Sequence, residues 1–168
     1  MNNKIIFSVL TFLFLAINVN FAQTKGQELP SIEIKDLKGN NVDVSDFSDG
    51  KKITIISFWA TWCTPCKKEL NNIAEIYDEW VEDYDLQLIA ISIDDSRSTA
   101  KVKAYINGQD WNFKVLQDAN SDLKRALNFQ TVPFTILLDQ NGKIVYRHTG
   151  YVEGDEYILE EEIATLIK

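Results

Sequence analysis

Runs of apolar residues along the chain predict its strands. Residues 31–44 alternate apolar and polar side chains around Lys38-Gly39-Asn40, which predicts a β-hairpin. Three further runs are almost wholly apolar and rich in β-branched residues, as in strands that are covered on both faces. These buried strands are predicted at 53–58, 86–93 and 134–138. Asn141-Gly142 then predicts a tight turn into a last strand at 144–148.

Helical periodicity predicts the remaining elements. Between 67 and 81, apolar side chains recur every three or four residues and form one stripe. Shorter helices are predicted at 98–107, at 118–128 and at the C terminus, where the apolar residues are Leu159, Ile163, Leu166 and Ile167. Strands that alternate with helices and end in an antiparallel pair predict an α/β fold. We expect a mixed central sheet with helices on both faces and an added N-terminal β-hairpin.

The N-terminal segment has the pattern of a secretory signal. Lys4 precedes an apolar run at 5–17, which is shorter than the about 20 residues that span a membrane. Ala22 is a plausible last residue before cleavage, although Asn20 fits the cleavage pattern poorly. We expect a signal peptide at 1–22, a short linker at 23–30 and one domain at 31–168, in an exported, periplasmic protein. The alternative is an uncleaved N-terminal membrane anchor that extends through Phe21.

The negative net charge of the chain argues against one class of binding partner. The whole chain has a net charge of −8, and without Lys4 the exported part would have 16 basic and 25 acidic residues, or −9. Such a surface repels phosphate backbones, so we expect no nucleic-acid binding. Asp94-Asp95 and Glu160-Glu161-Glu162 are expected to be solvated charges.

The only two cysteines, Cys63 and Cys66, lie between the first buried strand and the helix that follows it. This spacing suits either a redox pair or half of a zinc site. Zinc would need four ligands, and His148 is the only histidine, so we expect no metal and no cofactor. His148 itself is expected to be a partly exposed strand residue. A disulfide that closes so small a loop constrains the unfolded chain little, which favours redox chemistry over a structural bridge.

The start of a helix suits a reactive thiol. Cys63 would face free backbone N–H groups and the positive end of the helix dipole, and both favour the thiolate. Cys66, one turn inside, would be shielded, and Thr64-Pro65 supplies a proline that a first helical turn tolerates. Trp62 is expected at the surface around the sulfurs. Glu69 is either a base for the Cys66 proton or a solvated first-turn residue.

The segment 58–69, F-W-A-T-W-C-T-P-C-K-K-E, resembles the active-site signature of the TlpA/ResA group of exported, thioredoxin-like thiol–disulfide oxidoreductases. Weaker similarity lies at 44–47, at 116–118 and at Val132-Pro133 before the strand that ends in Leu138-Asp139. The resemblance implies a thioredoxin-like fold in which Cys63 is the attacking thiol and Cys66 the resolving thiol. It also implies that Pro133 is a cis proline beside them, and Val132 would offer its backbone to an extended substrate.

The same resemblance implies an enzyme that reduces, or alternatively oxidises, protein disulfides. Apocytochrome c and other exported proteins are candidate substrates, a membrane-embedded electron donor is implied, and we expect a monomer. Two positions depart from the pattern: Ser57 stands where thioredoxin has a buried aspartate, and Asn71 where group members often have proline. Two alternatives are a peroxiredoxin-like thiol peroxidase and a binding module with an inert disulfide.

Overall fold

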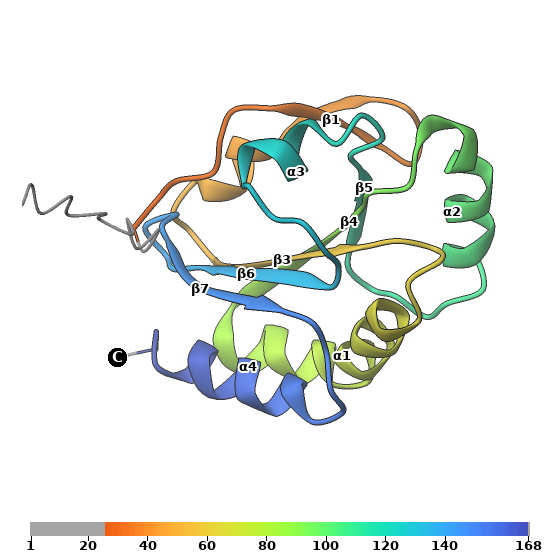
Figure 1. The fold of residues 1–168 in the computed structure, drawn as a ribbon. Coiled ribbons are helices and arrows are strands. Elements are labelled where there is room, and N and C mark those ends of the chain that lie inside the picture. Colours follow the sequence, from red (N-terminus) through yellow and green to blue (C-terminus); the bar gives the residue numbers. More distant parts are fainter. Residues whose placement is uncertain (1–25, 168) are drawn as a thin grey trace, which may run out of the picture.

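A computed structural model describes residues 26–167, which form a mixed sheet with helices packed on both of its faces (Figure 1). The strands lie in the order β2-β1-β5-β4-β3-β6-β7. They comprise β1 (Glu33–Asp36), β2 (Asn41–Asp43), β3 (Ile53–Trp59), β4 (Leu86–Ser92), β5 (Lys114–Gln117), β6 (Phe134–Leu138) and β7 (Ile144–Thr149). The helices are α1 (Thr64–Tyr84), α2 (Thr99–Ile106), α3 (Asp122–Ala126) and α4 (Asp155–Ala164), with 3₁₀ turns η1 (Val44–Ser48) and η2 (Ser96–Ser98). This arrangement confirms the predicted fold class.

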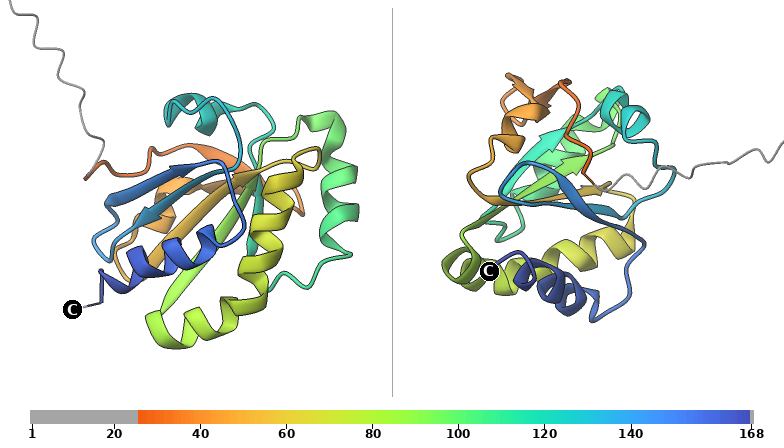
Figure 2. Two further views of the ribbon diagram at one scale, coloured as in Figure 1. Left: turned by 60° about the horizontal axis from the view of Figure 1, so that its bottom comes forward. Right: turned by 90° about the vertical axis from the view of Figure 1, so that its left-hand side faces the viewer.

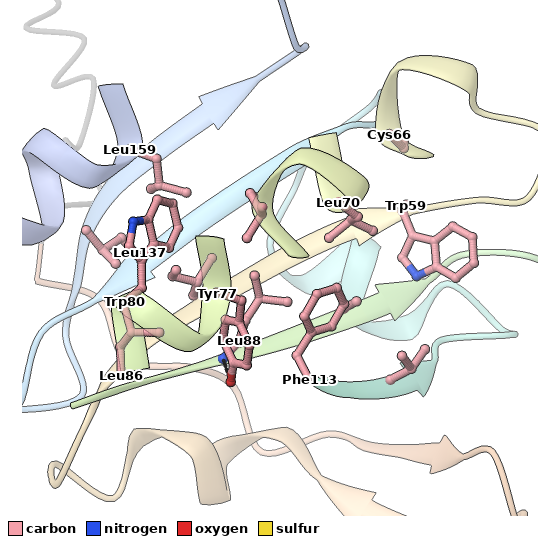
Figure 3. Close-up of a cluster of buried hydrophobic side chains, with 14 of the residues drawn as sticks. Trp59, Cys66, Leu70, Tyr77, Trp80, Leu86, Leu88, Phe113, Leu137 and Leu159 are labelled. Atoms are coloured by element: carbon pink, nitrogen blue, oxygen red, sulfur yellow. Dashed lines mark hydrogen bonds between the residues drawn. The ribbon is translucent and has the colours of Figure 1, made fainter. Parts of the chain in front are cut away.

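Strand β3 is central and every one of its residues is buried. It pairs with β4 in parallel and with β6 in antiparallel register. Because side chains alternate along a strand, Ile55 and Trp59 belong to the core under α1 and α4, whereas Ile56 and Phe58 belong to the core on the opposite face. Figure 3 shows part of the first core, in which Trp80 of α1 packs beside the sheet. Ser57 therefore faces α1.

The two helical layers differ in size. Helices α1 and α4 lie side by side on one face, while α3 and η1 cover part of the other (Figures 1 and 2). The larger first layer includes the apolar stripe of α1, which we predicted. The C-terminal helix ends at Ala164, so Ile167 lies beyond it and is exposed instead of extending its apolar face.

The sequence analysis missed strand β5. With only four residues it gives too short an apolar run to be recognised, yet it lies between β4 and the opening hairpin. The hairpin was predicted correctly, and it joins the sheet because β1 pairs with β5. Part of the expected linker also packs on the domain: Gly26 N donates to Ile144 O at 2.8 Å, and Leu29 is buried.

The predicted signal peptide at 1–22 lies outside the described residues. Within residues 26–167, the helices are all too short or too polar to cross a membrane.

Candidate active site

The site lies where β3 ends and α1 begins. Residues 60–63 connect the two elements, and Cys63 N donates to Ala60 O at 3.0 Å, which closes a tight turn. Cys63 is the N-terminal cap of α1, with extended backbone angles. The next residues, Thr64 and Pro65, form the exposed first turn of the helix, as predicted. A fully buried strand thus delivers the cysteine pair to one end of the sheet.

Cys63 and Cys66 form a disulfide, with their Cα atoms 5.4 Å apart. Cys66 N donates a hydrogen bond to Cys63 Sγ at 3.3 Å. The two sulfurs are not equivalent, because Cys66 is completely buried while Cys63 retains 4% of its exposure. Trp62, beside them, is 68% exposed and so presents a large apolar surface next to the disulfide. The expected surface position of Trp62 is confirmed.

Asp94 holds the turn that precedes the cysteines. Its carboxylate accepts from Thr61 N and from Thr61 Oγ1, both at 2.7 Å, and from Ser92 Oγ at 2.8 Å. The expectation that Asp94 is a solvated charge was therefore wrong, since only 3% of the residue is exposed. Hydrogen bonds from a backbone amide and two hydroxyls replace the water that burial removes. Asp95, by contrast, pairs with Arg97 near the surface.

The Val132–Pro133 bond is cis, as the resemblance implied. Pro133 directly precedes β6, whose first residue, Phe134, pairs with Phe58 near the end of β3. Val132 packs against the core cluster that contains Cys63 and Cys66. The fold therefore brings this loop to the same end of the sheet as the disulfide.

Glu69 projects from α1 into the protein instead of into solvent. One carboxylate oxygen accepts from Thr135 Oγ1 at 2.8 Å, and the other lies 3.4 Å from Ser57 Oγ. The residue is 4% exposed. Ser57, the position that lacks the buried aspartate, thus contacts a carboxyl that the helix supplies. This excludes the alternative that Glu69 is a solvated first-turn residue.

Burial raises the pKa of Glu69 from its ordinary value of 4.5 to about 7. The hydrogen bonds from Thr135 and Ser57 act in the opposite direction, and the negative charges of Asp155 and Glu156 raise the pKa further. Desolvation exceeds the hydrogen bonding because two hydroxyls replace only part of the water shell of a carboxylate. Glu69 can therefore accept and release a proton near neutral pH.

Asn71, the second departure from the group's pattern, has a contact of its own. Its side-chain oxygen accepts from Trp111 Nε1 at 2.9 Å. Trp111 packs edge-on against Trp59, with ring centroids 5.1 Å apart. Asn71 thus ties the middle of α1 to the aromatic cluster beside the strand that precedes the site.

Two supporting residues were missed by the sequence analysis, namely Thr135 and the buried Asp94. Thr135 interrupts an otherwise apolar strand, F-T-I-L-L, and Ser57 does the same in β3. A hydroxyl inside a fully buried strand must find a hydrogen-bond partner, and this requirement is the sequence signal that could have identified Thr135. The partner itself, Glu69, became evident only when α1 was placed on the sheet.

Comparison with known proteins agrees with this geometry. The model of the AhpC/TSA family matches residues 25–147. The thiol-disulfide oxidoreductase ResA of Bacillus cereus is 28% identical over 159 residues, which are 88% of this chain and 89% of that protein. The thioredoxin-like protein YneN of Bacillus subtilis is 30% identical over 133 residues, 79% and 75% of the two chains. A solved thioredoxin-like protein from Porphyromonas gingivalis is 42% identical, with a TM-score of 0.73 over 85% of this chain and 93% of that one.

A mixed sheet flanked by helices, with a C-x-x-C disulfide at the start of α1, defines a thioredoxin-like thiol–disulfide oxidoreductase. This class confirms the resemblance seen in the sequence. The chain belongs to the AhpC/TSA family.

The raised pKa of Glu69 predicts how stability depends on pH. Below the ordinary value of 4.5 the carboxyl is protonated in both states, and between 4.5 and about 7 only the folded protein keeps the proton. The free energy of unfolding should therefore fall as pH rises through this window, by about 3 kcal/mol in total, and then level off. Urea unfolding of the disulfide form measures this fall.

Glu69→Gln should remove this fall in the free energy of unfolding. The variant should therefore become more stable relative to the wild type as pH rises. Glu75→Gln, at an exposed position of the same helix, is the matched control and should keep the wild-type profile. Parallel profiles for wild type and Glu69→Gln would contradict the buried, protonated carboxyl.

Proposed function

We propose that this protein reduces disulfides of exported proteins by dithiol exchange. The Cys63 thiolate attacks a substrate disulfide, one substrate sulfur leaves with the electron pair, and a mixed disulfide forms. Cys66 then attacks Cys63 Sγ, which releases the second substrate sulfur and regenerates the disulfide that the structure shows. The cysteine pair is oxidised and the substrate is reduced.

Access and hydrogen bonding support Cys63 as the attacking thiol. It caps α1, where backbone N–H groups and the helix dipole stabilise a negative charge. The Cys66 amide already points at Cys63 Sγ and would donate to the thiolate once the disulfide is reduced. Cys66 is fully buried, so a substrate sulfur cannot reach it first.

The observation that carries the mechanism is the buried carboxyl one turn after Cys66. Resolution requires the Cys66 thiol to lose its proton, which a thiol in apolar surroundings does reluctantly. Glu69 lies three residues along the same helix, and its pKa of about 7 matches that of an effective general base at neutral pH. We therefore propose that Glu69 is the base that accepts the proton of the Cys66 thiol.

Electrostatics supports the reducing direction. A cysteine pair is strongly oxidising when its reduced form is stabilised as a thiolate. Here Glu69, three residues after Cys66 on the same helix, becomes negatively charged above about pH 7 and disfavours a further negative charge on the reduced cysteine pair. The reduced form is thus less stabilised, which favours electron donation to substrates.

Export is proposed from the signal-like segment before the domain. Lys4 and the apolar run at 5–17 support it, as does the similarity of 58–69 to exported oxidoreductases. In an oxidising compartment the protein would need a membrane-embedded donor to return its cysteines to thiols. We propose apocytochrome c or other exported proteins as substrates, which meet a monomer through exposed Trp62 and the half-buried Val132 that precedes the buried Pro133.

The order of attack predicts opposite behaviour of two serine variants. Cys66→Ser should accumulate mixed disulfides with substrate through Cys63, because no thiol remains to resolve them. Cys63→Ser should trap nothing, since its remaining thiol is buried. Mass spectrometry of acid-quenched reactions distinguishes the two, and efficient trapping through Cys66 would reverse the assignment.

Glu69→Gln should slow decay of the mixed disulfide by about 10²-fold near neutral pH and flatten its pH dependence. The reason is that the amide cannot accept the Cys66 proton. Rapid-quench kinetics of the reduced protein with a peptide disulfide separate this step from the initial attack, and Glu75→Gln should leave both steps unchanged.

If Glu69 acts only as a nearby charge, the initial attack should change instead and decay should not. Peroxide consumption by the same variants tests the peroxidase alternative, and a Cys63–Cys66 bond that resists dithiols would indicate an inert binding module.

A further inference from the structure

A small cavity is lined by Glu69 together with residues of β6, β7 and α4. Glu69 of α1, Thr135 of β6, His148 of β7 and Asp155 and Glu156 of α4 form its polar walls. Its volume of about 10 Å³ is close to the smallest that holds one water molecule. Several polar partners surround it, as an ordered water requires.

Register places His148 next to the Glu69 carboxyl. Thr135, which donates to Glu69, pairs with His148 across the β6–β7 ladder. Residues that pair directly across antiparallel strands present their side chains on the same face of the sheet. His148 therefore lies beside the Thr135–Glu69 contact, although the two residues are far apart in the sequence.

The His148 ring connects this cavity to the surface. Its Nε2 atom is buried and makes no hydrogen bond of good geometry within residues 26–167, but it lies 3.3 Å from Asp155 Oδ2. The side chain as a whole is 36% exposed, so the rest of the ring reaches solvent. An imidazole with one nitrogen inside and the remainder outside can accept a proton on one side and release it on the other.

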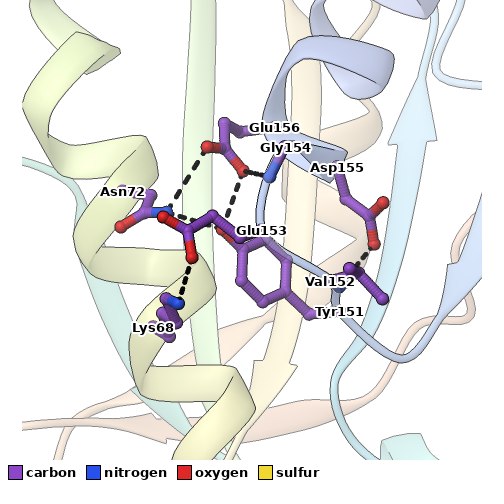
Figure 4. A network of polar contacts seen from close by, with 8 residues as sticks. All are labelled: Lys68, Asn72, Tyr151, Val152, Glu153, Gly154, Asp155 and Glu156. Atoms are coloured by element: carbon purple, nitrogen blue, oxygen red, sulfur yellow. Dashed lines mark hydrogen bonds and ion pairs between the residues drawn. The ribbon is translucent and has the colours of Figure 1, made fainter.

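The neighbouring charged and titratable groups are already engaged. Glu156 accepts from Tyr151 Oη at 2.7 Å and from Gly154 N at 3.1 Å, and Asn72 Nδ2 lies 3.3 Å from its other oxygen (Figure 4). Burial would raise the pKa of Glu156, but these hydrogen bonds outweigh it and keep the pKa below its ordinary value. Glu156 therefore remains ionised when Glu69 takes up a proton.

Asp155 is also fixed in place. Its Oδ2 accepts from Val152 N at 2.7 Å in the loop before α4 (Figure 4), and the same oxygen faces His148. The ring of Tyr146 lies parallel to that of His148, with ring centroids 6.2 Å apart. The imidazole thus has both a carboxylate and an aromatic ring as neighbours.

We propose that His148, oriented by Asp155, is the positioning residue through which Glu69 passes its proton to solvent, by way of one water in this cavity. The inference rests on the proposed function of Glu69 as the base for Cys66. Each turnover loads one proton onto a carboxyl that is 4% exposed, so the proton needs a path out of the core.

The transfers balance as follows. Cys66 gives its proton to Glu69, and its electron pair forms the bond to Cys63 Sγ while the substrate sulfur leaves as a thiolate. Glu69 then gives the proton to the cavity water, which passes one to His148 Nε2. The other imidazole nitrogen releases a proton to solvent, which leaves Glu69 ionised and the imidazole as its other neutral tautomer. Proton exchange with solvent restores the first tautomer before the next turnover.

His148→Ala should slow multiple-turnover reduction of a peptide disulfide by about tenfold or more when buffer is dilute, because Glu69 is no longer emptied quickly between turnovers. Added imidazole should restore the rate in proportion to its concentration, and it should not affect the wild type. His148→Gln keeps the ring's size and polarity more closely, and it should show the same loss if the alanine variant folds poorly. Thr149→Gln, at the exposed next position of β7, is the control and should reduce the peptide disulfide at the wild-type turnover rate.

The most discriminating comparison uses Glu69→Gln as the parent protein. Adding His148→Ala to that variant should not lower the rate further, and imidazole should not raise it, because His148 acts through Glu69. An unchanged rate for both His148 variants, a loss that imidazole does not restore, or full additivity with Glu69→Gln would each overturn the proposal. Failure of Cys66→Ser to trap substrate would instead refute the proposed function, whatever the His148 variants do.

Discussion

Strand β3 ends directly in the first turn of α1, and the rest of the site depends on that junction. Because β3 is buried on both faces, α1 must pack back along the sheet with its apolar stripe inward. The first turn of the helix then carries Cys63 and Cys66 at the end of the sheet. One turn later, the same inward-facing stripe places Glu69 against Ser57 and Thr135. The geometry of the redox pair and that of its base thus have one origin.

The burial of the Glu69 carboxyl lowers the stability of the fold and at the same time suits the group to proton transfer. Its burial destabilises the folded state once the surrounding pH exceeds the ordinary pKa of glutamate, and two hydroxyls offset only part of that cost. The same desolvation moves the pKa to about 7, where the group can accept a thiol proton and give it up again. Asp94 is a structural carboxylate instead: amide and hydroxyl donors satisfy it, and it holds the Thr61 turn.

The sequence was enough to predict features that depend on local pattern. The buried strands, the long helix and the hairpin follow from periodicity, and the position of the cysteines follows from the strand and helix on either side of them. The sequence pattern did not predict contacts between segments that are far apart in the chain. Strand β5 is too short to show a pattern, and the fate of Asp94 depended on the position of Thr61. His148 was correctly expected to be partly exposed, but only the β6–β7 register shows that it lies opposite Thr135.

The central claim is that the Glu69 carboxyl of the disulfide form stays protonated up to about pH 7. Carbon-13 NMR of protein labelled at the glutamate side-chain carboxyl measures this directly, and Glu69→Gln identifies the signal by its loss. The account predicts a titration midpoint near 7 for that signal. A midpoint near 4.5, the ordinary value, would contradict it.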